Sequence, residues 1–229
     1  PGSIAFNLRA MLHAAGAVRD RLSPDILRVH HGVRQQLAAW RQRTGWTDRD
    51  GIADLDALVT LLAAVRGLQQ DEVFPDHTWR FMALGRRLEQ GVLLSELLAE
   101  ALVEPLDTAD EITLLSALLS VFESAGAYRR QFPGDVRVDR LLRLLLLNED
   151  NPRSLNAVLR RLLEHMRGLP SDVPEDLLPQ DVRLVLDARA RVRLADPLSL
   201  ADGGQRRQAL EQLLAGVVGQ LQAAAVHLA

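Results

Sequence analysis

Pro152-Arg153-Ser154-Leu155, followed by Leu159-Arg160 and Leu163, repeats a pattern that the chain carries 151 positions earlier. The earlier copy is Pro1-Gly2-Ser3-Ile4, followed by Leu8-Arg9 and Leu12. In both copies a Pro-x-Ser start opens an apolar helix, with aliphatic residues at i, i+4 and i+8 and an arginine after the second of them. A period this long predicts an internally duplicated helical domain rather than a short-repeat solenoid, with a first repeat that is truncated at its N-terminus.

The composition and the apolar spacing of the rest of the sequence also indicate helices. Leu and Ala dominate the 48% of residues that are apolar, and aromatic residues make up only 4%. Leu, Ala, Arg, Glu and Gln are strong helix formers, and no segment alternates apolar and polar residues for long enough to form a strand. The sequence therefore predicts an all-α bundle of about nine helices in one domain, residues 1–229, with helices near 4–18, 24–43, 55–67, 78–103, 108–130, 138–147, 152–167, 181–193 and 204–228.

Several helix boundaries have recognisable signals. Ser23-Pro24-Asp25 supplies an N-cap, a first-turn proline and a first-turn acid. Thr108 and Glu111 have the spacing of a capping box. The segment 138–147 is nearly all apolar, so we expect a buried helix there, and the three prolines within 168–180 make that segment the best linker candidate.

Two residue types are missing, and their absence excludes whole classes of chemistry. There is no cysteine, so disulfides, cysteine metal sites and thiol catalysis are excluded. All 27 basic residues are arginine, so a Schiff-base lysine and a Walker-type phosphate loop are excluded as well. No apolar run approaches the roughly 20 residues that span a bilayer. We expect a cytoplasmic protein without a cofactor, and no binding to membranes or nucleic acid.

The net charge of −3 conceals a strong segregation of charge along the chain. Residues 1–50 and 127–170 are rich in arginine, whereas residues 51–126 carry 13 acidic residues against 4 arginines. Arginine-rich helices on either side of an acidic block can neutralise it within one fold, which is the interpretation we favour. The alternative is a bipolar surface on which a partner docks.

The six histidines show no metal-binding spacing, so no metal site is predicted. The one acidic cluster with a histidine is the loop around Asp71, Glu72, Asp76 and His77. These side chains could bind a divalent ion, although a solvated acidic loop is far commoner.

Four carboxylates form a stripe along the helix predicted near 78–103. Glu89, Glu96, Glu100 and Glu104 are spaced by seven, four and four residues, which places them on one helix face. Like charges at this spacing destabilise a helix slightly, so we expect arginines to face the stripe, with Arg86 within reach of Glu89. The structural interpretation is favoured over a docking face for a partner, and catalysis by Glu89 is a third option.

A stripe of arginines lies on the helix of the second copy. Arg153, Arg160 and Arg167 recur every seven residues and therefore share a face. Guanidinium groups in such an array can bind carboxylates or phosphates in a bidentate manner. Pairing with acids of the 51–126 block is the favoured interpretation.

Four short motifs, in this order along residues 1 to about 170, resemble the bacterial alpha-E family. They are Val18-Arg19-Asp20-Arg21-Leu22-Ser23, then Trp79-Arg80-Phe81 through Leu84-Gly85-Arg86-Arg87-Leu88-Glu89, then Tyr128-Arg129-Arg130, and finally Leu144 through Asn151-Pro152-Arg153-Ser154. The resemblance implies an all-helical domain that works beside circularly permuted ATP-grasp proteins and transglutaminase-like proteins. Its role would then lie in a peptide amide-ligation or peptide modification system.

The chain departs from the family pattern at two polar sites. His13-Ala14 stands where the family usually has Glu-Asn, and Gln90-Gly91 stands where it usually has Arg-Ala. These departures argue against a shared enzymatic role.

The leading hypothesis is a non-catalytic scaffold or docking domain of an ATP-grasp-type ligase system, with Arg129, Arg153, Arg160, Glu96 and Glu100 as contacts for a partner or an anion. The first alternative is an enzyme of the same system that uses Glu89 as acid or base, with Arg86, Arg129 and Arg153 as ligands of a carboxylate or phosphate. The second alternative is a purely structural domain of a larger polypeptide.

Overall fold

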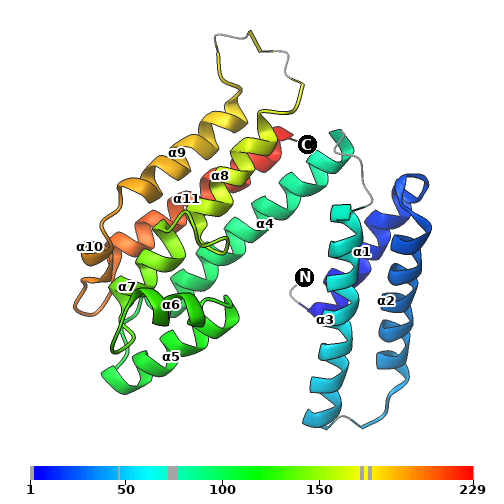
Figure 1. Cartoon of the computed structure of the whole chain (residues 1–229), viewed down its shortest axis with the longest axis horizontal. Helices are drawn as coiled ribbons and strands as arrows, with labels where there is room; N and C mark the ends of the chain where they lie inside the picture. The colour runs from blue at the N-terminus through cyan, green and yellow to red at the C-terminus, as the bar shows by residue number, and fades with distance from the viewer. Residues whose placement is uncertain (1–2, 46, 72–76, 171–172, 175–176, 229) are drawn as a thin grey trace. The chain divides into compact units, whose positions relative to one another are not determined.

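The computed structural model describes residues 3–45, 47–71, 77–170, 173–174 and 177–228, leaving out the side chains of residues 70, 71, 77 and 78. Within these ranges all regular secondary structure is helical, in eleven α-helices and two short helical turns (Figure 1). The all-α expectation is therefore confirmed. The chain divides into two compact units, unit 1 over residues 1–76 and unit 2 over residues 77–229.

Unit 1 is a small group of three long helices, α1 (Ile4–Ala17), α2 (Pro24–Gln42) and α3 (Asp48–Asp71), with a 3-10 turn, η1 (Arg19–Arg21), between the first two. The side-chain oxygen of Ser23 accepts a hydrogen bond from Ile26 N–H, so the predicted N-cap of α2 is confirmed. Ser3 caps α1 in the same way, through Phe6 N–H. The core of the unit is small, and its described cluster of buried apolar side chains consists of Leu8, Leu12, Val33, Leu37 and Leu58.

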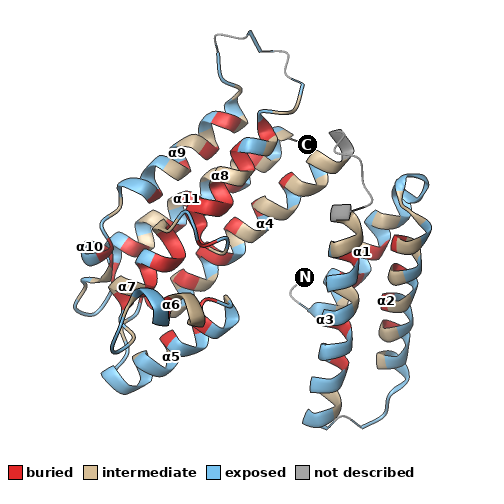
Figure 2. Ribbon diagram, viewed as in Figure 1, coloured by how far each residue is buried: buried red, intermediate tan, exposed pale blue. Residues whose placement is uncertain are grey.

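Unit 2 is built around four helices that pack in a ring. These helices are α4 (His77–Leu102), α8 (Leu155–Met166), α9 (Gln180–Leu194) and α11 (Gln208–Leu228). Helix α4 packs against α8 and α11, and α9 packs against the same two helices, which closes a four-helix bundle (Figure 1). The inward faces are buried, whereas the outer faces are largely exposed (Figure 2).

The sequence of α4 explains why it lies in the bundle. Six of its buried positions alternate in steps of four and three, as in coiled coils: Leu84, Leu88, Gly91, Ser95, Leu98 and Leu102. Leu94 is buried beside this stripe. Gly91 permits a close approach of α11, because a Cβ at this position would lie 2.8 Å from Leu221 Cδ1. The hydroxyl of Ser95 donates to Gly91 O at 2.8 Å, so this buried polar group is satisfied.

Short helices cover one end of the bundle. They are α5 (Thr108–Val121), α6 (Ala125–Gln131), α7 (Val138–Leu142), which continues as a π-helical turn η2 (Arg143–Leu147), and α10 (Pro197–Ala201). The leucines at 141, 142, 144, 145 and 146 are at most 1% exposed, so the predicted burial of the segment 138–147 is confirmed. Helix α10 contacts α7, and α7 contacts both α5 and η2.

The helix expected over residues 108–130 is wrong as a single element, because it breaks after Val121. Glu123 adopts a left-handed conformation (φ +48°), Glu123 N–H donates to Ser120 O, and Ser124 N–H donates to Leu119 O. These two bonds form a Schellman motif, a helix end at which glycine is usual and glutamate is not. The break and the short α10 account for two helices beyond the expected nine.

The start of α5 also differs from the expectation. Asp107 is the N-cap, and its Oδ1 accepts from the N–H groups of Ala109 and Asp110. Thr108 lies inside the helix, so the predicted capping box of Thr108 and Glu111 is wrong. Glu111 instead pairs with Arg207 at 2.6 Å.

Helix α11 is the one described helix that is long and apolar enough to cross a bilayer by length and composition alone. Its buried residues are Leu210, Leu214, Val217, Leu221 and Ala224, which belong to the core of unit 2. Packing against α4 and α9 accounts for this buried face, because a core helix needs an apolar face.

Candidate functional site

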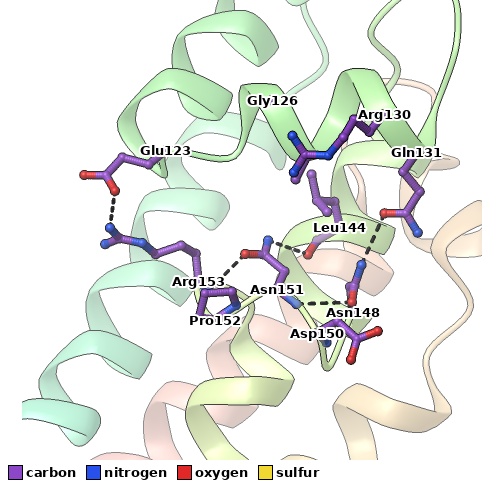
Figure 3. A pocket seen from close by; sticks show the side chains of 11 residues that line it. Glu123, Gly126, Arg130, Gln131, Leu144, Asn148, Asp150, Asn151, Pro152 and Arg153 are labelled. Carbon is purple, nitrogen blue, oxygen red and sulfur yellow. Dashed lines mark hydrogen bonds and ion pairs between the residues drawn. The ribbon is translucent and has the colours of Figure 1, made fainter.

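The candidate site is an open pocket of about 820 Å³ on unit 2, between α6 and the loop that leads from η2 into α8 (Figure 3). Its wall on the α6 side includes Glu123, Arg130 and Gln131. The opposite wall is the loop Asn148–Arg153. Two of the motifs that resemble the alpha-E family, Tyr128-Arg129-Arg130 and the segment from Leu144 to Ser154, therefore meet at this pocket.

Asparagines fix the conformation of the loop. Asn148 Oδ1 accepts from the backbone N–H groups of Asp150 and Asn151 at 2.9 and 3.2 Å, which forms an Asx turn. Asn148 Nδ2 donates across the pocket to Gln131 Oε1 at 3.2 Å. This last bond connects the loop directly to α6.

Asn151 is buried at the base of the pocket and has partners on three segments. Its Nδ2 donates to Leu144 O at 3.1 Å and to Ser124 Oγ at 3.3 Å, and its Oδ1 accepts from Arg153 N–H at 3.1 Å. The side chain of Asn151 therefore ties the loop to η2 and to the start of α6. Because both Nδ2 and Oδ1 of this amide are hydrogen-bonded, replacing Asn151 by an apolar residue would leave buried polar groups of these segments without a partner.

A second asparagine supports the loop from outside the pocket. Asn156 Nδ2 donates to Leu147 O and to Glu149 Oε1, and Asn156 Oδ1 accepts from Arg189 Nε at 3.0 Å. Arg189 also donates to Glu149 at 3.0 Å. The hydrogen bond from Arg189 is the main cause that lowers the pKa of Glu149, so this carboxylate is charged at neutral pH. These bonds attach the loop to α9.

Charged side chains lie at the rim of the pocket. Arg153 forms an ion pair with Glu123, whose left-handed backbone ends α5 (Figure 3). Arg130 is exposed and has no ion pair or hydrogen bond within the described part of the chain. The carboxylate of Asp150 likewise has no partner among the described residues. The site therefore offers one unpaired guanidinium, one exchangeable ion pair and a row of amides.

This arrangement suits binding better than chemistry. Guanidinium groups recognise carboxylates and phosphates by paired hydrogen bonds, and amides recognise the peptide backbone. None of the described lining residues is a histidine or a serine. Both lining carboxylates, Glu123 and Asp150, are exposed, and Glu123 is already paired with Arg153.

The predicted carboxylate stripe lies on the exposed face of α4. Glu89, Glu96 and Glu100 are exposed and have no ion pair among the described residues, so the expected pairing of Glu89 with Arg86 or another arginine is wrong there. Only Glu104 of the stripe is paired in this part of the chain, with Arg206 at 2.9 Å. The reason is the register of α4, which buries Leu88 and Gly91 and leaves the neighbouring stripe outside. Glu89 does not line the pocket.

The arginines predicted as ligands are distributed differently from the expectation. Arg153 lines the pocket and pairs with Glu123 of the acidic block, as predicted. Arg160 pairs instead with Glu164 one turn along its own helix, at 2.6 Å. Arg129 is exposed and does not line the pocket, whereas its neighbour Arg130 does.

The expected neutralisation of the acidic block by the arginine-rich segments is confirmed for two of its carboxylates in the described ranges, Asp54 with Arg43 and Glu123 with Arg153. Two further carboxylates, Glu104 and Glu111, pair with Arg206 and Arg207, which lie outside those segments. The possible metal loop around Glu72 and Asp76 lies outside the described residues. In the described ranges no group of three histidine or acidic side chains could hold a metal ion.

Sequence reasoning missed four residues of this site, Glu123, Arg130, Asn148 and Asn151. Two signals were present. Asn148 and Asn151 flank a turn directly after an all-leucine segment, where asparagines commonly bond to the backbone. Arg130 follows Arg129, and only the position of the break between α5 and α6 determines which of the two faces the pocket.

The chain is similar in sequence to several known proteins. Uncharacterized proteins of Mycobacterium tuberculosis (strains H37Rv and CDC 1551) and Mycobacterium bovis are 30% identical to it over 232 residues, which is 96% of this chain and 25% of each relative. The chain thus spans about a quarter of the length of these relatives. No solved structure matches it.

Residues 1–229 match the Alpha-E family, which is described as a predicted alpha-helical domain with a conserved ER motif. No Glu-Arg dipeptide occurs in this sequence, and Glu89-Gln90 occupies the place where the family resemblance puts one. In the structure the side chain of Gln90 accepts a hydrogen bond from Arg87, whose Nη1 lies 2.8 Å from Gln90 Oε1. With the family match running through both compact units, the chain belongs to the Alpha-E family.

Proposed function

We propose that this chain is a non-catalytic docking domain of an ATP-grasp-type peptide ligase or modification system. In this proposal the pocket of unit 2 receives an acidic segment of the partner, and Arg130 makes the first contact. The observation that carries the proposal is the rim of this pocket, where the guanidinium of Arg130 has no partner among the described residues. The ATP-grasp partner itself follows from the family resemblance.

The ion pair between Arg153 and Glu123 supports an exchange of partners. The two side chains are 36% and 70% exposed, and exposed ion pairs contribute only about 0–1 kcal/mol. A carboxylate of an incoming peptide can therefore replace Glu123 at Arg153 at little cost. The loop behind it keeps its shape, since its own bonds run through Asn148 and Asn151.

The lengths of the relatives are consistent with a domain that works within a larger assembly. In the mycobacterial proteins the matching region is 25% of the chain. A purely structural domain of a larger polypeptide remains the alternative, and it makes a different prediction, because it needs no charged contact at Arg130.

The two ideas are separated by charge reversal. Arg130→Glu and Arg153→Glu should each weaken binding to the cognate circularly permuted ATP-grasp protein by about tenfold or more, because a charge-assisted contact becomes a repulsion. Arg129→Glu is the matched control, since Arg129 is exposed on the same helix and lies outside the pocket. Binding should also weaken as salt rises from about 50 to about 300 mM.

Biolayer interferometry with the purified proteins measures these affinities. Equal affinities for the variants at 129, 130 and 153 would refute docking at this pocket. A complete lack of association with the ATP-grasp protein would refute the partner and leave the structural alternative.

We further propose that the domain arose by duplication of a helical unit. The first helices of the two copies are capped alike: Ser3 Oγ accepts from Phe6 N–H at 3.2 Å, and Ser154 Oγ accepts from Ala157 N–H at 3.1 Å. A crystal structure tests this idea, which fails if the helices that flank α1 cannot be superposed on those that flank α8.

A further inference from the structure

A second pocket lies in unit 1, between α1 and α2, and its lining carries no carboxylate. Its volume is about 280 Å³, and its lining residues are Leu12, Ala15, Gly16, Arg19, Leu27, His30, His31 and Arg34. Apolar residues and Gly16 provide the lining from α1 and the start of α2. The polar part of the lining consists of two arginines and two histidines.

The cationic side chains of this pocket have not been neutralised by the fold. Arg19 and Arg34 are exposed, and neither guanidinium group has an ion pair or hydrogen bond within the described residues. By contrast, Arg28 of the same helix pairs with Asp25 at 2.8 Å. Unpaired arginines around a concave, acid-free surface create a positive potential that attracts anions.

His30 provides an independent indication of a ligand. Its side chain is only 7% exposed, and its Nδ1 is buried without a hydrogen-bond partner in the described structure. Burial, and secondly the charge of Arg34, lower the pKa of His30, so the ring is neutral at pH 7. Buried polar atoms without partners are rare in folded proteins and call for an explanation such as an absent ligand or water.

We propose that this pocket binds the phosphate group of free inorganic phosphate or of a small phosphomonoester. Two guanidinium groups match the two negative charges of such a group, and their N–H donors match its oxygens. The unpartnered Nδ1 of His30 can add a donor that a monocarboxylate, with two oxygens and one charge, does not require, whereas His31 is already bonded through its Nε2 to Gln35 Nε2 at 3.0 Å. This site is separate from the proposed docking pocket, which lies in unit 2.

Gly16 allows the pocket to be filled without removing a charge. A Cβ at this position would have no heavy atom within 4 Å, and the backbone is helical, so larger side chains are tolerated there. Gly16→Leu would place its side chain in the pocket while it improves helix propensity. Gly51→Leu is the matched control, because Gly51 also has no neighbour within 4 Å and lies in α3, outside the pocket.

Isothermal titration calorimetry of the full chain with inorganic phosphate, glycerol 3-phosphate and acetate tests the proposal. Phosphate should bind more tightly than acetate, and Arg34→Gln and Arg19→Gln should each weaken it by about tenfold or more. Gly16→Leu should abolish binding, whereas Gly51→Leu and Arg41→Gln, an exposed arginine of α2 outside the pocket, should leave it unchanged.

The two sources of phosphate are distinguished by the second ligand. Binding of glycerol 3-phosphate supports a phosphomonoester as the ligand, and exclusive binding of inorganic phosphate supports the free ion. Nuclear magnetic resonance of the His30 ring gives a second readout, because phosphate should shift its signals in the wild type and not in Gly16→Leu. Acetate binding equal to that of phosphate, or phosphate binding that survives Arg34→Gln and Gly16→Leu, would overturn the proposal.

Discussion

Arg207 should be among the most important polar residues for the stability of unit 2. Its side chain is only 6% exposed and makes three hydrogen bonds, to Leu102 O at 2.7 Å, to Ala201 O at 3.0 Å and to Glu111 Oε1 at 2.6 Å. Its backbone N–H also donates to Val103 O at 2.8 Å. One residue thus satisfies carbonyl groups at the C-terminal end of α4 and connects them to α5 and α10.

The perturbation is Arg207→Met, which keeps the aliphatic volume and removes the guanidinium. Two carbonyls lose a donor, each at a cost of about 1–3 kcal/mol, and Glu111 loses its ion pair. Glu111 is 23% exposed, so water recovers part of that last loss. We expect the free energy of unfolding to fall by about 3–5 kcal/mol, the range found when one partner of a buried ion pair is removed.

The adjacent Arg206 is the control. Arg206 pairs with Glu104 and Glu211, but its side chain is 45% exposed, so Arg206→Met should change stability only slightly. Urea unfolding, monitored by hydrogen exchange and mass spectrometry, gives the free energy of unfolding of each unit separately, and peptides of unit 1 serve as the internal reference. Equal losses for the two variants, or a loss below about 1 kcal/mol for Arg207→Met, would show that the guanidinium is not the connection we describe.

Two further predictions concern packing and pH. Gly91→Val should destabilise unit 2 by about 1–3 kcal/mol, because the new side chain meets the buried Leu221. Gly85→Ala, on the exposed face of α4, should instead stabilise the unit by up to about 1 kcal/mol, because alanine has the higher helix propensity. Thermal unfolding measures both changes, and an unchanged stability of Gly91→Val would contradict the close packing of α4 on α11. Burial is the main cause that lowers the pKa of His30 and of His165, so the unfolded chain takes up more protons than the folded one below the unfolded pKa of about 6.5. The free energy of unfolding should therefore be highest above pH 6.5 and decrease as the pH falls below it. In His30→Gln and His165→Gln the urea midpoint should depend less on pH between about pH 7.5 and 5.5 than in the wild type. An unchanged pH dependence in both variants would rule out these two rings as the cause.

The sequence alone was enough to predict helices and their buried faces. Apolar spacing predicted α1, α2 and α8, the N-cap at Ser23 predicted where α2 begins, and the nearly all-apolar segment 138–147 predicted a buried helix. These features are local, because a helix needs only its own periodicity and cap to be recognisable. The family could also be recognised from short motifs in order, since such motifs are properties of the sequence itself.

The candidate pocket could not be predicted in the same way, because it depends on contacts between distant residues. The break at Glu123 places a left-handed glutamate where glycine is usual, and it is held by the Schellman bonds and paired with Arg153, 30 positions away. That break turns Arg130, rather than Arg129, toward the pocket. The pairing of Arg207 with Glu111 spans 96 positions in the same way. Periodicity determines which face of a helix is apolar, but only the packing of one helix on another determines which charged side chains meet and which, like Glu89, remain exposed.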